Sequence, residues 1–429
     1  MAPYQISKTG PVRQNLDASI NQSAMNYSAR QDSDIVFSGS YDLSSRGKIC
    51  VLTIDGGGMR GIIPARVLSY LEQSLQRQSG NPAARIADFF DVAAGTSIGG
   101  VLISMLFADD GKDRPLCTAA DTYSFTTKKG SIVFKLNPLQ QLFGRLRGMT
   151  RPRYSSKFFE TELKQMFSRE GTSLTLRNTL KPLLIPCYNL ATASPFIFSR
   201  GDAMDSSAWD FRLWEVCRAT SSVPSLFKPP LLTSVDGSNS CIAADGGLVL
   251  HNPAAAAITH VLHNKREFPH VQGLQDLLVL SIGTGQFDRK FEHAKVSNWG
   301  ALQWISPVLR IIMDGSADMV DRTISMAFGE ARHNYIRVQM SGLPDRALME
   351  MDDPSQSNVD RLAKYADDLL TEKGYIHLPF GSKRMLEQSN AERLDWLAGQ
   401  LVQEQKARLL RTSPTVILRK ACKLLKTRF

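Results

Sequence analysis

The order of apolar and polar positions predicts alternating strands and helices from about residue 48 onward. Short apolar runs are typical of buried strands, and apolar residues repeating every three or four positions are typical of helices. We expect strands within 48–54, 89–95, 181–190, 195–200, 241–247 and 276–285, and helices within 63–78, 99–108, 210–220 and 252–265. This alternation favours an α/β fold, with a three-layer, mainly parallel sheet and helices on both faces.

The two ends of the chain depart from this alternation. Residues 1–46 are rich in Ser, Asn, Gln and Asp without periodicity, which predicts a polar N-terminal extension. Beyond about residue 290 the pattern becomes mostly helical, with amphipathic stretches at 317–328, 357–373 and 390–410. We therefore expect an α/β domain at 47–290, followed by a helical C-terminal region with a basic tail at 291–429.

Residues 89–108 have the length of a membrane span, with Asp91 as their only charge. A Gly-x-Ser-x-Gly turn in the middle favours instead a buried strand, a tight turn and a buried helix. No apolar signal segment follows Met1, and the six cysteines form no CxxC pair. These features favour a cytoplasmic protein without a disulfide framework.

The net charge of +10 is concentrated in two segments that lack Asp and Glu, residues 122–159 and 406–429. Each segment carries eight Lys or Arg residues, and the rest of the chain is net acidic. Such patches favour a localised anionic partner, although two solvated charged faces are the simpler alternative. No nucleic-acid-binding module is recognisable, so we expect peripheral binding to an anionic membrane surface and no nucleic acid.

Both basic segments also contain apolar residues whose spacing is compatible with contact to a membrane surface. In the tail, one helical face would carry Leu418, Ala421, Cys422, Leu425 and Phe429. Basic side chains on the opposite face are typical of a helix that lies in a membrane interface. The other segment interleaves its charges with Phe125, Phe134, Phe143, Tyr154, Phe158 and Phe159, which suggests an interfacial cap near the functional site.

Three glycine-containing turns each follow a predicted strand, at 55–61, 95–100 and 245–247. Ligands of open α/β sheets bind beyond the carboxyl ends of the strands, so the three turns are expected to meet at one site. The second turn contains Gly95, Ser97 and Gly99 in the Gly-x-Ser-x-Gly pattern. Small residues around a serine allow the tight elbow that exposes a nucleophilic hydroxyl, although a helix N-cap is an alternative role for this serine.

A serine nucleophile needs a base within hydrogen-bond reach. The third turn provides Asp245, followed by Gly246 and Gly247. Asp245 could take the proton directly. Alternatively, it could orient a histidine that acts as the base, and His251 is the candidate for that role. A carboxylate is a weak base unless burial raises its pKa.

The first turn matches the dinucleotide fingerprint as Gly56, Gly58 and Gly61. That fingerprint also requires an acidic residue about 20 positions later, at the end of the second strand, and this residue is missing. Consecutive glycines can instead present backbone N–H groups to an oxyanion. Gly57 and Gly58 are the expected donors, with Arg60 bracing the loop.

The three turns stand in the chain as DGGGMRG, GTSIGG and DGG, and in this order they resemble the motifs of the patatin-like phospholipase family. The resemblance extends from about Lys48 to about Leu401 and implies the patatin-like fold, with the catalytic domain at 47–290. It implies a Ser97–Asp245 dyad that does not need His251, and an oxyanion hole in the first glycine loop. Some stretches are closest to a plant subgroup in which the serine is often glycine and the first loop is degraded; this chain retains both.

The resemblance implies a serine hydrolase that cleaves fatty acyl esters of phospholipids, and also of galactolipids, through an acyl-serine intermediate. No cofactor is expected. The seven histidines form no metal-ligand spacing and no EF-hand loop is present, so neither a metal site nor a calcium requirement is expected. The alternative function is that of a membrane-associated scaffold or regulator with little activity.

Overall fold

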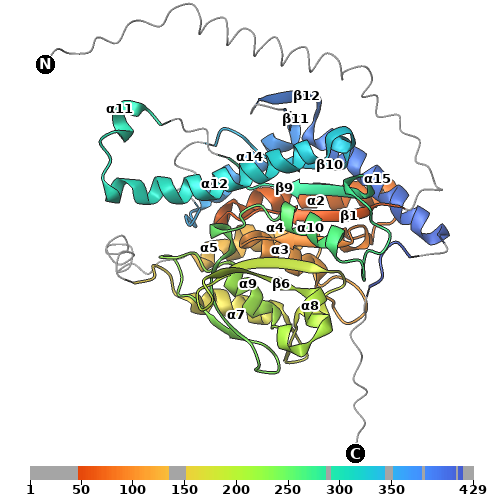
Figure 1. The fold of residues 1–429 in the computed structure, drawn as a ribbon, viewed down its shortest axis with the longest axis horizontal. Coiled ribbons are helices and arrows are strands. Elements are labelled where there is room, and N and C mark those ends of the chain that lie inside the picture. Colours follow the sequence, from red (N-terminus) through yellow and green to blue (C-terminus); the bar gives the residue numbers. More distant parts are fainter. Residues whose placement is uncertain are drawn as a thin grey trace, which may run out of the picture.

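The computed structural model describes residues 47–134, 151–286, 291–343, 351–378, 382–411 and 414–418. These residues form an α/β fold in which helices cover both faces of a central sheet (Figure 1). The polar extension expected at 1–46 lies outside the described residues. So does most of the helical face expected at 418–429.

The central sheet has eight strands in the order β10-β9-β1-β2-β5-β8-β7, and β6 also pairs with β5. The parallel part consists of β10 (Tyr335–Val338), β9 (Leu277–Ile282), β1 (Ile49–Ile54), β2 (Val92–Gly95) and β5 (Leu183–Asn189). The antiparallel strands are β6 (Ser194–Ser199), β7 (Leu231–Thr233) and β8 (Ser240–Asp245). The predicted mainly parallel sheet is therefore confirmed.

Two helical layers enclose this sheet. One face is covered by α2 (Ile62–Ser79), α3 (Ile98–Phe107) and α9 (Leu213–Thr220), and the other by α10 (Ala254–His263) and α12 (Ala301–Ala327). Further out, α14 (Gln356–Thr371) and α15 (Asn390–Leu410) pack against α2. The three-layer arrangement agrees with the fold class expected from the sequence.

The central strand β1 is buried along its whole length because both of its faces are covered. Leu52 and Ile54 belong to the core shared with α2 and α3, whereas Ile49 and Val51 belong to the core shared with α10. This two-sided burial explains why the strand is a continuous apolar run rather than an alternating one.

The strand β5 changes partner along its length, and this change creates the functional site. Leu183 and Leu184 pair in parallel with β2, whereas Cys187–Asn189 pair with the antiparallel strand β8. The last residue of β8, Asp245, lies opposite Cys187. The turns that follow β2 and β8 therefore approach each other from opposite directions. The sequence pattern instead predicts that all three turns follow strands that run in the same direction.

The region beyond residue 290 contains the predicted helices and also three strands that the sequence pattern did not predict. β10 has only four residues and extends the central sheet next to β9. β11 (Lys373–His377) and β12 (Lys383–Ser389) form a separate antiparallel pair. The polar sequence KRMLEQS of β12 has no buried face, so it carries no apolar strand signal.

One cation of the basic tail, Arg408, holds α15 against the body of the protein. Arg408 Nη2 lies 2.6 Å from Asp91 Oδ2, and its Nε lies 3.0 Å from Glu404 Oε1. Arg411 pairs with the same Glu404 carboxylate at 2.6 Å. These two residues of the predicted basic patch therefore have structural partners.

Candidate active site

Ser97 occupies the turn between β2 and α3 in a strained backbone conformation, with φ 54° and ψ −123°. Non-glycine residues rarely adopt a positive φ, and such strain concentrates at functional sites. The backbone N–H of Ser97 donates to Thr220 Oγ1 at 2.9 Å, which holds the turn from the end of α9. This is the strand-to-helix elbow predicted from Gly-x-Ser-x-Gly.

The glycines on both sides of Ser97 are required by close backbone contacts. A Cβ atom on Gly95 would lie 2.3 Å from the carbonyl oxygen of Gly99. A Cβ atom on Gly99 would lie 2.4 Å from the carbonyl oxygen of Ile54, the last residue of β1. Only glycine fits at either position, so the elbow is held tightly against the sheet.

The Ser97 hydroxyl donates a hydrogen bond to Asp245 Oδ2 at 2.9 Å. The other carboxylate oxygen, Oδ1, accepts the backbone N–H of Gly247 at 2.7 Å. Ser97 occupies the N-cap position of α3, but its side chain makes no capping bond, so its hydroxyl does not cap the helix. Both residues are buried, which places a serine hydroxyl and a carboxylate in direct contact away from bulk water.

Asp245 has the electrostatic properties of a base. Burial raises the pKa of its carboxyl to about 7, and the Gly247 amide, the Ser97 hydroxyl and Arg218 offset this effect only in part. A general base is most effective when its pKa lies near the working pH. The buried position of Asp245 therefore provides the raised basicity that an exposed aspartate lacks.

His251 lies beside this pair but is not hydrogen-bonded to it among the described residues. A Cβ atom on either Gly56 or Gly247 would lie 3.3 Å from His251 Nδ1, and this nitrogen has no partner in the described part of the chain. Burial, together with the smaller effect of the charges of Arg60 and Arg337, lowers the pKa of His251 to about 3. The imidazole is therefore neutral and packs behind the site.

The first glycine loop runs alongside Ser97. A Cβ atom on Gly56 would lie 3.3 Å from Ser97 Cβ, and the Gly56 backbone N–H donates to the carbonyl of His251 at 3.2 Å. Gly58 adopts a φ of 57°, a left-handed conformation that glycine permits. The backbone N–H groups of Gly57 and Gly58 have no acceptor among the described residues.

Several groups hold this loop in place. Arg60 is buried and donates from Nη1 to the carbonyl of Gly285 at 3.0 Å, which agrees with the bracing role expected for it. The backbone N–H of Met59 donates to the carbonyl of Met351 at 2.9 Å. Asp352, the next residue, accepts from Tyr154 Oη at 2.8 Å and from Arg153 at 2.7 Å.

Asp55, the first residue of the DGGGMRG motif, is held by a buried ion pair that the sequence did not reveal. Both of its carboxylate oxygens accept from Arg337 on β10, and Nη1 lies 3.0 Å from Oδ1. Arg337 Nη1 also donates to Ser281 Oγ at 2.8 Å. The start of the glycine loop is therefore fixed by a strand from the C-terminal region.

An apolar cavity opens at Ser97. Its aromatic lining comes from Phe125, Phe134, Phe159 and Phe227, and the glycine loop contributes Gly58 and Met59. The predicted position of the 122–159 aromatics near the site is thus correct for three of them, whereas Phe158 is 64% exposed and Phe143 lies outside the described residues. A cavity with this lining suits an acyl chain.

Similarity to known proteins shows the family to which this chain belongs. A model of the family described as patatin-like phospholipase matches residues 52–258. Patatin-like protein 6 of Arabidopsis thaliana is 48% identical over 386 residues, which cover 88% of this chain and 76% of that protein. The chain belongs to the patatin-like phospholipase family. Its family is one of lipid acyl hydrolases, and lipids are the substrate class that membership implies.

One of the relatives carries a name that describes it as inactive. A relative named probable inactive patatin-like protein 9, also from Arabidopsis thaliana, is 45% identical over 369 residues, covering 85% of this chain and 89% of its own. Overall similarity to patatin-like proteins therefore does not establish activity. The geometry around Ser97 has to carry that inference.

Among solved structures, VipD from Legionella pneumophila is similar over 80% of this chain and 68% of its own. The sequence identity is 14% and the TM-score is 0.28. A similarity this low adds nothing to the fold described above.

Two further observations concern metals and membranes. No group of three or more His, Cys, Asp or Glu side chains within the described ranges is arranged to hold a metal ion. In the same part of this patatin-like chain, no helix is long and apolar enough to cross a membrane. Residues 89–108 form β2, the Ser97 turn and α3, as predicted.

Proposed function

We propose that this protein is an active serine hydrolase that cleaves fatty acyl esters of phospholipids, and of galactolipids as a second class, by a Ser97–Asp245 dyad. The observation that carries this proposal is the 2.9 Å hydrogen bond between Ser97 Oγ and Asp245 Oδ2 in a buried elbow. The apolar cavity beside Ser97 supports a fatty acyl chain as the bound part of the substrate.

In the first step, Ser97 Oγ attacks the acyl carbonyl carbon while its proton passes to Asp245. The negative charge that develops on the carbonyl oxygen is held by the backbone N–H groups of Gly57 and Gly58, while Arg60 braces the loop. Each such donor contributes about 3 kcal/mol to stabilisation of the transition state. Collapse of the tetrahedral intermediate breaks the ester bond, and the leaving alcohol takes the proton from Asp245.

In the second step, water hydrolyses the acyl-serine ester. Asp245 takes one proton from the attacking water, and the second tetrahedral intermediate is held by the same two amides. Its collapse releases the fatty acid and returns the proton to Ser97 Oγ. The neutral His251 has no proton-transfer role in either step.

The membrane is the surface on which these substrates occur. We propose peripheral association with an anionic bilayer at the side of the molecule that carries the basic, aromatic segment 151–159. Exposed cations and apolar side chains on one surface are typical of proteins that bind the lipid headgroup region. Nucleic acid and cofactors have no part in this mechanism.

A fluorophosphonate probe and a fatty acid release assay test the proposal together. We expect the probe to label Ser97 and phospholipid vesicles to release fatty acid with the wild type only, not with Ser97→Ala. Ser104→Ala is the matched control, because Ser104 lies on α3, the helix that follows Ser97, and its hydroxyl bonds to the Gly100 carbonyl at 2.8 Å. An unlabelled wild type that releases no fatty acid would favour the scaffold function.

A further inference from the structure

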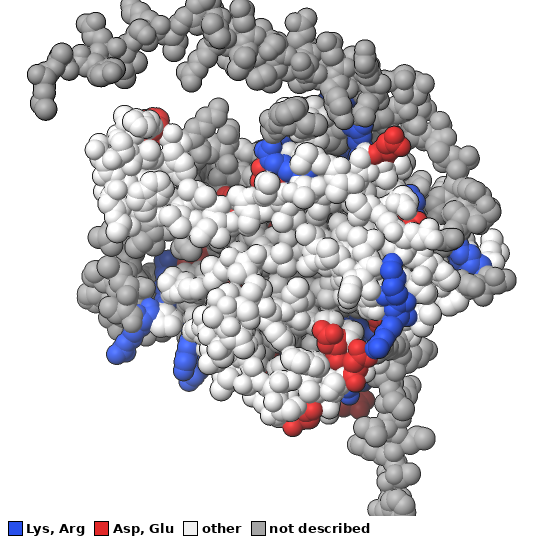
Figure 2. Space-filling view, in the orientation of Figure 1, with Lys and Arg blue, Asp and Glu red and all other residues white. Residues whose placement is uncertain are grey.

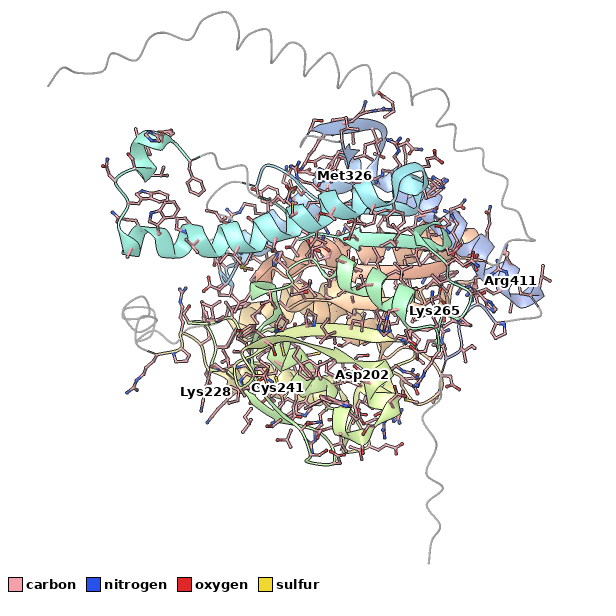
Figure 3. All side chains as sticks on the ribbon, in the orientation of Figure 1. Asp202, Lys228, Cys241, Lys265, Met326 and Arg411 are labelled. Atoms are coloured by element: carbon pink, nitrogen blue, oxygen red, sulfur yellow. The ribbon has the colours of Figure 1, made fainter. Side chains whose placement is uncertain are left out.

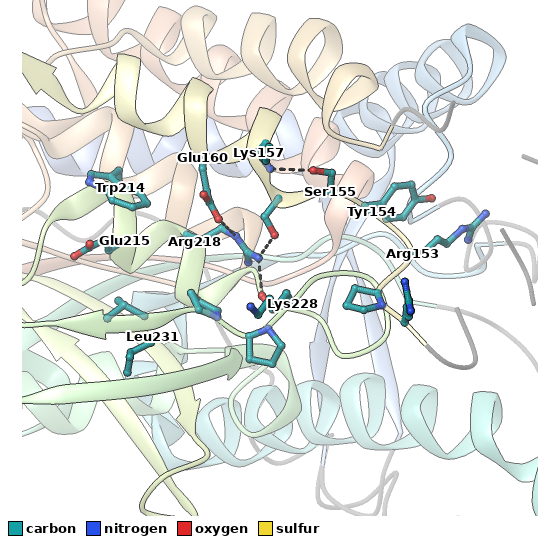
Figure 4. Close-up of a pocket in the computed structure, with 16 residues that line it drawn as sticks. Arg153, Tyr154, Ser155, Lys157, Glu160, Trp214, Glu215, Arg218, Lys228 and Leu231 are labelled. Carbon is teal, nitrogen blue, oxygen red and sulfur yellow. Dashed lines mark hydrogen bonds and ion pairs between the residues drawn. The ribbon is translucent and has the colours of Figure 1, made fainter. Parts of the chain in front are cut away.

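A second hollow lies beside the acyl cavity, between the start of α7 (Ser156–Met166) and strand β7 (Figure 4). Phe227 separates the two spaces: its ring lines the acyl cavity, and the Arg218 guanidinium of the second hollow lies 5.2 Å from the ring centroid. The catalytic Ser97 does not line this hollow. It is therefore a separate site with its own chemistry.

The charged side chains that line the hollow are mainly cationic. Five basic residues face it, Arg151, Arg153, Lys157, Arg218 and Lys228, against the two carboxylates of Glu160 and Glu215. On the face drawn in Figure 2, basic side chains protrude at the lower left, the side on which Figure 3 labels Lys228. A concave surface of one charge sign attracts ligands of the opposite sign.

The two carboxylates neutralise only part of this charge. Glu160 is paired with Arg218 Nε at 3.4 Å, and Glu215 is paired with Arg212, which lies outside the hollow. The carboxylate of Asp352 forms an ion pair with Arg153. The acidic groups around the hollow are therefore already paired with these three arginines.

Three of its cations remain without an acidic partner among the described residues, namely Arg151, Lys157 and Lys228. All three side chains are exposed at the mouth. They form the unneutralised charge that an incoming anion would meet.

A buried guanidinium links the two chain segments that carry Lys157 and Lys228. Arg218 is 1% exposed, and its Nη2 donates to the backbone carbonyl of Lys228 at 2.7 Å and to Ser156 Oγ at 2.5 Å. Ser156 directly precedes Lys157 at the start of α7. Figure 4 shows these bonds radiating from Arg218 at the centre of the hollow. The walls are therefore set before any ligand binds, which limits the ordering that binding requires.

The rim of the hollow is apolar and exposed. Leu231 lines it and is 68% exposed. Phe158, which follows Lys157 on α7 and does not itself line the hollow, is 64% exposed. Exposed apolar groups next to unpaired cations match the boundary between lipid headgroups and acyl chains. A small, water-soluble anion would gain nothing from contact with these apolar side chains.

We propose that this hollow binds the phosphate group of an anionic phospholipid, as a non-catalytic site that holds the protein on the membrane beside its substrate. Lys157 and Lys228 contact the phosphate, and Leu231 contacts the acyl region. The site rests on the membrane association proposed above, but binding at it requires no hydrolysis by Ser97.

Sedimentation with vesicles tests this proposal in the Ser97→Ala background, where lipids are not consumed. The vesicles contain phosphatidylcholine alone or phosphatidylcholine with phosphatidic acid. We expect Lys157→Gln/Lys228→Gln to bind the phosphatidic acid vesicles about 30-fold more weakly, the equivalent of about 2 kcal/mol for two basic residues. The matched control is Lys112→Gln/Lys364→Gln, which removes two exposed lysines that do not line the hollow and lie outside both basic segments.

Equal weakening by the two double variants would overturn the site, because it would indicate diffuse surface charge. Melting temperatures establish whether the variants are folded. A second measurement needs no variant: a short-chain, water-soluble phosphatidic acid is expected to displace the Ser97→Ala protein from vesicles, at constant ionic strength. If inorganic phosphate displaces it equally well, the assignment to a lipid headgroup is wrong.

Discussion

The Ser97 hydroxyl and the Asp245 carboxylate are joined by a hydrogen bond of 2.9 Å, and burial raises the pKa of Asp245 to about 7. Only the ionised carboxylate can accept the serine proton. We therefore expect hydrolysis of a soluble short-chain ester to increase with pH through about 7 and to level off above it. A stopped assay across this range, with constant ionic strength, measures the profile. A rate independent of pH around 7 would contradict the assignment of Asp245 as the base.

Replacing Asp245 should abolish hydrolysis and increase the free energy of unfolding. The ordinary pKa of 3.8 is raised in the folded state, so folding favours the protonated carboxyl, and stability decreases as pH rises from about 4 to about 7. Asp245→Asn removes this effect and should increase the free energy of unfolding at alkaline pH by up to about 4 kcal/mol. Urea unfolding above pH 7 and near pH 4 should show the gain only at the higher pH. Hydrolysis by this variant should be lost.

His251 should be dispensable for chemistry. Because its imidazole is neutral and has no bond to Ser97 or Asp245 among the described residues, His251→Ala is expected to retain activity within about tenfold of the wild type. The vacated volume should lower the free energy of unfolding by about 2 kcal/mol or more. Ester hydrolysis and urea unfolding of the same preparation separate the two effects. A loss of activity matching that of Ser97→Ala would indicate a triad.

The ion pair between Asp55 and Arg337 should be needed for stability. Arg337→Met leaves a buried carboxylate without its partner, and such losses cost about 3 to 5 kcal/mol. Asp55→Leu/Arg337→Met removes both charges and should regain a large part of that loss. Urea unfolding of the two single variants and the double variant gives the coupling energy. Additive losses would mean that the pair contributes little.

The sequence was sufficient to predict the residues that lie on the three turns, because each turn carries its own local pattern. Gly95 and Gly99 are recognisable because close backbone contacts exclude every larger residue. Thr220 and Arg337 were missed since they reach the site from distant elements and belong to no local motif.

The direction of β8 was missed for a related reason. A strand of six residues has the same apolar pattern whether it pairs in parallel or antiparallel, so the exchange of partners along β5 could not be inferred. The alternating β12 and the four-residue β10 were overlooked because neither has a long apolar run. What sequence reasoning lacks here is long-range pairing rather than local conformation.

The antiparallel pairing of β8 with β5 also provides a way to measure the fraction of natively folded molecules in a preparation. Ser97 and Asp245 are 148 positions apart, and they meet only after β2, β5 and β8 have joined one sheet. A partly folded chain would possess the serine but not its base. Covalent labelling of Ser97 should therefore count native molecules in a preparation, and its decline during heating should report the loss of the central sheet directly.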